Sequence, residues 1–187
     1  MRVVWEMTAA HGDKKYVVYE DESYTYAEIH AQVRKLAQFL GNNGVKLGDR
    51  VAISTRNYPG WVVTYWACVS IGVACVGMNA WWTPVEMEYA LNDSQPKMLI
   101  VDDERLERFG QMPNPFDVPV IAVRTDRPVP AGGFRWTDIM AMADPGVLPP
   151  VEIDPDDDAT IFYTSGTTGF PKGAQLHHRG SVDNVMN

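Results

Sequence analysis

A run without any charged residue, from Asn57 to Val85, limits the folds that this chain can adopt. A membrane-spanning helix needs about 20 apolar residues, so the run is long enough to cross a bilayer. However, Pro59 lies near its start, Gly72 interrupts it, and lysine and arginine are not clustered at one flank. We therefore expect a buried helix from about Pro59 to Ile71, followed by a buried strand from Val73 to Met78.

The segments around this run alternate between helical and strand patterns. Apolar residues recur three or four positions apart along one predicted helix: Ile29, Val33, Leu36 and Leu40. Two T-x-x-E sequences, Thr25 to Glu28 and Thr83 to Glu86, are typical of capping boxes at helix starts. The expected strands are residues 15–19, 51–54, 73–78, 98–101, 118–123 and 159–163. This alternation predicts an α/β fold, a mainly parallel sheet with helices on both faces.

Composition excludes several classes of function. Apolar residues make up 45% of the chain, enough to bury a core, and the net charge is −8. That charge argues against general nucleic-acid binding and against anionic membrane surfaces, so an anionic ligand must be held by local groups.

Cys68 and Cys75 have neither zinc-site nor redox-pair spacing, and we expect buried thiols. A charge arrives too early between Met1 and Glu6 for a signal peptide, which favours a cytoplasmic location.

The strongest chemical signal is the run from Tyr163 to Gly173, YTSGTTGFPKG. Glycines allow several backbone N–H groups and hydroxyls to face one anion, and Lys172 adds a positive charge suited to a phosphate. The NTPase pattern G-x-x-x-x-G-K-[ST] fails because Gly173 follows Lys172. The dinucleotide pattern G-x-G-x-x-G fails because the glycines stand at 166, 169 and 173. The run predicts a phosphate-binding loop of another kind, with an ordinary Gly/Thr hairpin as the plain alternative.

The longer run YTSGTTGFPKGAQLHHRG resembles the signature loop of the acyl-adenylate-forming (AMP-binding) superfamily. This superfamily includes acyl-CoA synthetases, adenylation domains of peptide synthetases and firefly-type luciferases. Four other stretches resemble family segments in kind and order: residues 24–29, 48–53, 70–79 and 83–89. The resemblance covers essentially the whole chain. It implies that residues 1–187 are the first part of the large N-terminal domain, without the rest of that domain or the small C-terminal domain.

The family reaction has two halves. A carboxylate attacks the α-phosphorus of ATP, which gives an acyl-adenylate and pyrophosphate, and the thiol of CoA then attacks the acyl carbon. Donors aimed at the leaving phosphates lower the barrier of the first half. The resemblance implies that the ATP phosphates are bound by Thr164, Ser165, Gly166, Thr167, Thr168, Gly169 and Lys172. Gly173 is implied to permit close backbone approach.

The resemblance implies ATP, Mg²⁺ and CoA as substrates or cofactors of the parent enzyme, with a small carboxylic acid as the other partner. In the family, the Mg²⁺-binding glutamate, the adenine and acyl pockets and the catalytic lysine come later in the sequence. No complete catalytic set and no metal ligand are therefore expected in this chain, and the isolated chain is expected to be inactive.

Two histidines, one asparagine and an acidic run are further candidates for contact with a ligand. His178 resembles the histidine that follows the loop in the family, which implies a part in shaping the acyl or loop pocket; a packed or solvated histidine is an equal alternative. His177 is expected at the surface and Asn79 in a turn. The acidic run from Asp154 to Asp158 offers potential metal ligands, but a solvated turn accounts for it as well.

Two classes of function remain open at this point. The first is a fatty-acid–CoA ligase, with an aryl-CoA ligase or a peptide-synthetase adenylation domain as the alternative within the same chemistry. The second is a truncated, non-catalytic binding or assembly module. A parallel sheet cut part-way leaves an unpaired edge, which invites self-association. An ATP-dependent thermal shift would favour the first class, and a dimer without such a shift the second.

Overall fold

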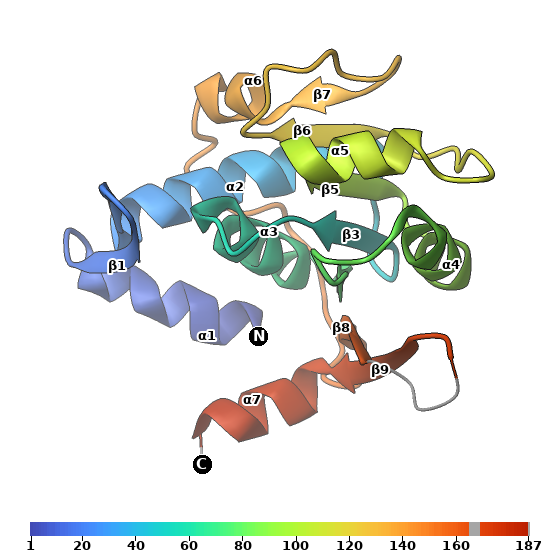
Figure 1. The fold of residues 1–187 in the computed structure, drawn as a ribbon. Helices are drawn as coiled ribbons and strands as arrows, with labels where there is room; N and C mark the ends of the chain where they lie inside the picture. Colours follow the sequence, from blue (N-terminus) through green and yellow to red (C-terminus); the bar gives the residue numbers. More distant parts are fainter. Residues whose placement is uncertain (165–168, 187) are drawn as a thin grey trace.

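The computed structural model describes residues 1–164 and 169–186 (Figure 1). In these residues the main feature is a seven-stranded sheet with the strand order β7-β6-β5-β3-β4-β8-β9. Neighbouring strands are parallel throughout, except that β8 and β9 form an antiparallel pair. The strands are β3 (Arg50–Ser54), β4 (Ala74–Gly77), β5 (Met98–Asp102), β6 (Val120–Val123), β7 (Phe134–Arg135), β8 (Asp158–Thr164) and β9 (Lys172–His177). The predicted α/β class with a mainly parallel sheet is confirmed.

Helices cover both faces of this sheet, as predicted. Alternate strand residues point to opposite faces, so Ile53 and Ile100 belong to one core and Leu99 and Val101 to the other. The first core is covered by α1 (Arg2–Met7), α2 (Tyr26–Asn42), α3 (Pro59–Ser70) and α6 (Trp136–Ala141). The second is covered by α4 (Pro84–Ser94) and α5 (Asp103–Gly110). Figure 1 shows these two groups of helices around the sheet.

The uncharged run folds as the predicted helix followed by a strand, α3 and then β4. Gly72 joins them with a φ of +68°, and a Cβ there would lie 2.1 Å from Leu47 Cδ1, so glycine is needed for both reasons. Among the described residues no helix is both long enough and apolar enough to span a membrane. Cys68 and Cys75 are buried free thiols, as expected.

Both predicted capping boxes are present. The Thr25 hydroxyl accepts from the backbone N–H of Glu28, and the Glu28 carboxylate accepts from the N–H of Thr25 at 2.8 Å. Thr83 and Glu86 form the same reciprocal pair at the start of α4. The helix face predicted for α2 is fully buried: Ile29, Val33, Leu36 and Leu40.

Five elements lie outside the sequence prediction: α1, the 3₁₀ helix η1 (Thr8–His11), β2 (Glu22–Thr25), β7 and β9. The segment between the predicted strand at residues 15–19 and the predicted helix start at Thr25 contains a strand as well, because β1 (Lys15–Tyr19) and β2 form a hairpin. Its turn uses Glu20 at a φ of +50° instead of the glycine or asparagine that marks such turns. The helix α1 has too few residues for a periodic signal. It is held by the buried Trp5, whose ring stacks on His30 at 3.9 Å.

Candidate functional site

The candidate site lies where β8 ends, at the edge of the sheet where the carboxyl ends of the parallel strands meet. We call this the carboxyl edge. Thr164 is the last residue of β8, and it pairs directly with Lys172, the first residue of β9. Directly opposed residues of an antiparallel pair carry their side chains on the same face, with Cβ atoms about 5 Å apart. The hairpin therefore brings one predicted hydroxyl and the predicted lysine together, and both residues are exposed.

The other predicted loop residues divide into two groups. Gly169 is exposed and has a φ of +106°, in the region that favours glycine. The remaining predicted phosphate ligands lie outside the described residues: Ser165, Gly166, Thr167 and Thr168.

Gly173 has a packing role at this position. It pairs with Tyr163, and a Cβ added to it would lie 2.9 Å from Ile161 Cγ2 and 3.4 Å from the Tyr163 ring. The absence of a side chain therefore lets the ring of Tyr163 lie over β9. The sequence pattern marked Gly173 for backbone approach to a ligand, and the structure adds this second reason.

Tyr163 is itself fixed by residues that the sequence did not single out. Its hydroxyl donates to Asp93 Oδ2 at 2.6 Å, and its ring meets Trp82 edge-on with the ring centres 5.5 Å apart. Burial, and then the hydrogen bond to the Asp93 carboxylate, raise the pKa of Tyr163 well above its usual value. Tyr163 therefore remains a neutral donor at physiological pH.

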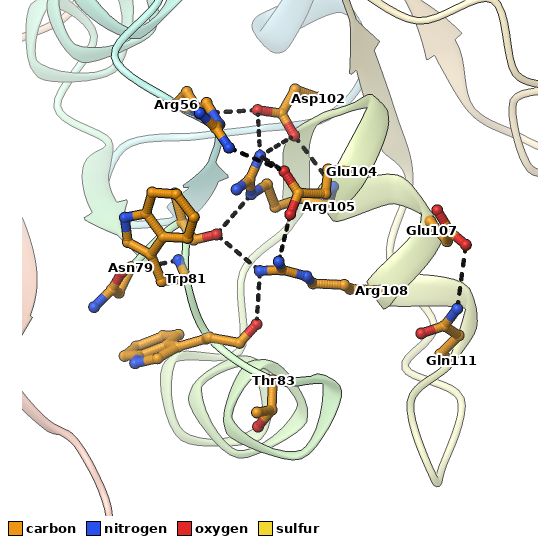
Figure 2. A network of polar contacts seen from close by, with 12 residues as sticks. Arg56, Asn79, Trp81, Thr83, Asp102, Glu104, Arg105, Glu107, Arg108 and Gln111 are labelled. Carbon is orange, nitrogen blue, oxygen red and sulfur yellow. Dashed lines mark hydrogen bonds and ion pairs between the residues drawn. The ribbon is translucent and has the colours of Figure 1, made fainter.

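A second group of polar residues occupies the same edge after β3, β4 and β5 (Figure 2). Asp102 and Arg105 are almost fully buried, and Arg105 Nη1 lies 3.1 Å from both Asp102 carboxylate oxygens. Asp102 also accepts from the backbone N–H of Arg56 at 2.9 Å, so it joins the segments that follow β3 and β5.

The segment after β4 is tied to the same group by two arginines. Arg105 Nε donates to the carbonyl of Ala80 at 2.7 Å, and Arg108 donates to the carbonyls of Ala80 and Trp82 at 2.9 and 3.0 Å. Asn79 is a turn residue, as expected, because its side-chain oxygen accepts from the N–H of Trp81. Figure 2 shows these contacts converging on the residues before α4.

Comparisons with known proteins decide the family. The family described as AMP-binding enzyme matches residues 4–187. The chain belongs to the AMP-binding enzyme family.

Two curated relatives illustrate the family's range. A 4-coumarate–CoA ligase from Arabidopsis thaliana is 30% identical over 166 residues, which cover 87% of this chain and 30% of the relative. A 4-hydroxybutyrate–CoA ligase from Metallosphaera sedula is 30% identical over 181 residues, covering 93% of this chain and 33% of the relative. The chain therefore spans about a third of the length of such curated relatives.

A solved structure agrees in fold. The anthranilate CoA ligase AuaEII, in complex with anthranoyl-AMP, superposes with a TM-score of 0.83 at 25% identity. The match covers 94% of this chain and 34% of that one. The resemblance to adenylate-forming enzymes that the sequence indicated is confirmed.

His178 follows β9 at the end of the strand away from Lys172. It comes six positions after Lys172, or about 20 Å away at the usual rise per strand residue. Its ring is buried and lines a cavity of about 600 Å³ between α1 and α7 (His178–Met186). Its Nδ1 lies 3.4 Å from the amino group of Met1. Burial, and then that ammonium group, lower the pKa of His178 to about 4. Its part in the acyl pocket stays a prediction.

Two basic residues near His178 contact acidic side chains. The Arg179 guanidinium contacts Asp156 at 2.8 and 3.1 Å, and the exposed His177 ring lies 3.3 Å from Asp158. The acidic run forms a turn in which the N–H of Asp154 donates to the Asp157 carboxylate. Over residues 1–164 and 169–186, no group of three histidine, cysteine or acidic side chains is arranged to hold a metal ion.

Proposed function

We propose that this chain is part of a CoA ligase that activates a carboxylic acid with ATP. The carboxylate attacks the α-phosphorus of ATP, and an acyl-adenylate and pyrophosphate form. The thiol of CoA then attacks the acyl carbon, a thioester forms and AMP leaves. The observation that carries the proposal is the pairing of Thr164 with Lys172 at the carboxyl end of β8, in a member of the AMP-binding family.

In this proposal the hairpin binds the leaving phosphates. Lys172 is exposed and, in the part of the chain that the structure describes, no carboxylate lies within ion-pair distance of it. Its charge is therefore available to the pyrophosphate. The proposed phosphate ligands are Thr164, Ser165, Gly166, Thr167, Thr168, Gly169 and Lys172.

Mg²⁺ enters the proposal only with the nucleotide. In this proposal the hydroxyls and the lysine act on phosphate oxygens, and oxygen atoms are also the ligands that Mg²⁺ prefers. When bound, Mg²⁺ would neutralise charge on the same phosphates. This chain's part is to orient them.

The class of acid is the finer part of the proposal. Two of the relatives above are named for aromatic acids, 4-coumarate and anthranilate, and one for 4-hydroxybutyrate. We therefore propose an aromatic acid as the first candidate and a fatty acid as the second. Acid-dependent exchange of labelled pyrophosphate into ATP by the whole protein distinguishes them, because only an accepted acid supports the exchange.

One observation favours a second candidate function, an assembly module. β9 forms one edge of the sheet, and all six of its residues are exposed. Such an edge is able to pair with a strand of a second copy. Sedimentation at twice the monomer mass, combined with no response to ATP, would support this function over the ligase.

The phosphate site is tested by calorimetric titration of the chain with ATP–Mg²⁺ and with pyrophosphate. Lys172→Ala should weaken binding of both by about 10-fold or more, the usual cost of losing a charged hydrogen bond. Lys97→Ala removes the same charge from an exposed residue just before β5, at the opposite edge, and should leave both affinities unchanged. Equal affinities for wild type and Lys172→Ala would overturn the assignment.

A further inference from the structure

Both ends of the predicted phosphate-binding loop (Tyr163 to Gly173), as far as the structure describes them, contact the same helix, α4. Before the loop, the Tyr163 hydroxyl donates to Asp93 Oδ2 at 2.6 Å and lies 3.4 Å from the carbonyl of Ala90. After the loop, the Phe170 ring stacks on Tyr89 with the ring centres 4.7 Å apart and an interplanar angle of 22°. Tyr89 and Asp93 are four residues apart, so they lie on one face of α4.

The helix that carries these two residues is firmly fixed. Its capping box closes the first turn, and its other face packs into the second core through Met87 and Leu91, which are almost fully buried. The segment before it is held by the arginines of α5, whose side chains bind the carbonyls of Ala80 and Trp82. Trp82 in turn contacts the Tyr163 ring. The contacts therefore run without a break from the buried Asp102–Arg105 pair to the loop.

The anchored residues lie next to the proposed phosphate ligands. Tyr163 directly precedes Thr164, and Phe170 comes two residues before Lys172. A change at either anchor would therefore displace the hydroxyl or the ammonium group relative to its partner across the hairpin. Phe170 is 54% exposed, so its stack on Tyr89 is not enforced by general burial.

We propose that Tyr89 and Asp93 are positioning residues for the phosphate site. Tyr89 acts through Phe170 and Asp93 acts through Tyr163, and together they set the position of Lys172 and Thr164 before a nucleotide binds. The inference rests on the proposed phosphate-binding function. Neither residue touches the nucleotide in this scheme.

Hydrogen exchange tests the anchoring without any nucleotide. In Tyr89→Ala, the amides of residues 169, 170, 172 and 173 should exchange about 3- to 10-fold faster than in wild type, the factor expected for loss of one aromatic pair. Tyr89→Phe keeps the ring and should restore the wild-type rate. Val85→Ala changes an exposed residue of the same helix and serves as the control. Unchanged exchange in Tyr89→Ala would overturn the proposal.

A double-variant cycle separates positioning from general destabilisation. If Tyr89 acts through Phe170, the effects of Tyr89→Ala and Phe170→Ala on exchange and on ATP–Mg²⁺ affinity should not add, and the double variant should resemble either single one. Additive effects would overturn the proposal. Asp93→Asn should weaken ATP–Mg²⁺ binding about 3- to 10-fold, because the Tyr163 hydroxyl then donates to a neutral acceptor instead of a charged one.

The outcomes also distinguish this inference from the function on which it rests. Should Lys172→Ala leave nucleotide affinity unchanged while Tyr89→Ala still accelerates exchange, the phosphate assignment fails and the anchoring stands. Should Lys172→Ala abolish affinity while Tyr89→Ala changes neither exchange nor affinity, the phosphate assignment stands and the anchoring fails.

Discussion

Removing the Asp102 carboxylate should be among the most damaging single changes to this fold. Asp102→Ala leaves the Arg105 guanidinium buried, with only 1% of its side chain exposed. The carboxylate accepts from Arg105 Nη1 and from the backbone N–H groups of Arg56 and Arg105, so the change breaks an ion pair, a connection between two strands and a helix cap at once. The atom Arg105 Nη2 already has no hydrogen-bond partner among the described residues.

The size of the effect follows from what is left behind. Breaking a buried ion pair by removing one partner costs about 3–5 kcal/mol, because a buried charge is left uncompensated. Glu104 lies 3.0 Å from Arg105 and is 42% exposed, so it retains part of the compensation. We therefore expect a loss near the lower end, about 3 kcal/mol. For a domain whose total stability is about 5–15 kcal/mol, this is a large fraction.

Urea unfolding followed by circular dichroism measures this loss directly. Asp103→Ala is the matched control, because it removes the neighbouring carboxylate, which is 46% exposed and contacts Arg127. The control should change the unfolding midpoint far less than Asp102→Ala does. A loss below about 1 kcal/mol for Asp102→Ala would refute the reasoning, since that is the range of exposed ion pairs. The double variant Asp102→Ala, Arg105→Met should recover much of the loss, because it removes the unpaired charge.

Two further predictions concern the β8–β9 hairpin and α7. Gly173→Ala should lower the free energy of unfolding, measured with urea, by about 1–3 kcal/mol, because its Cβ would lie 2.9 Å from Ile161 Cγ2. The control Gly180→Ala should cause no such loss, because no atom lies within 4 Å of its Cβ. His178, with its pKa lowered to about 4 from 6.5, should make the fold lose up to about 3 kcal/mol as the pH falls from about 6.5 to 4, since only the unfolded state takes up the proton in that window. His30, whose pKa is also lowered by burial, adds to the same window. His178→Gln should reduce this pH dependence, and an unchanged slope of stability against pH would contradict the assignment.

The parts of the fold that could be predicted are those with a local signal. The buried stripe of α2 and the two capping boxes depend on residues three or four apart, and all of them are present in the structure. The hairpin β1–β2 and the strand β7 escaped prediction because tertiary pairing decides them. β7 has two residues and is defined by its pairing with β6, and the turn after Tyr19 uses a non-glycine residue at positive φ.

The same distinction applies to the candidate site. Its loop was visible in the sequence because glycines, hydroxyls and a lysine are adjacent in the chain. The residues that hold the loop in place were not visible in the sequence. Tyr163 and Asp93 are 70 residues apart, and Tyr89 and Phe170 belong to different parts of the chain. The Asp102–Arg105 pair was not visible either, because the contact of Arg105 with the Ala80 carbonyl joins residues 25 positions apart in the sequence.

The distribution of charge explains how a chain of net charge −8 could bind a polyphosphate. Five arginines at the carboxyl edge contact a carboxylate, and two of them share Glu104: Arg56 with Glu104, Arg105 with Asp102, Arg108 with Glu104, Arg124 with Glu22 and Arg127 with Asp103. In the described residues Lys172 has no such partner. Surface charges are screened over about 8 Å at physiological salt, so distant acidic residues repel a phosphate at the β8–β9 hairpin only weakly. A paired arginine would first have to break its ion pair to bind phosphate. Lys172 would not, which is why its removal should cost more affinity than the removal of any of these five arginines.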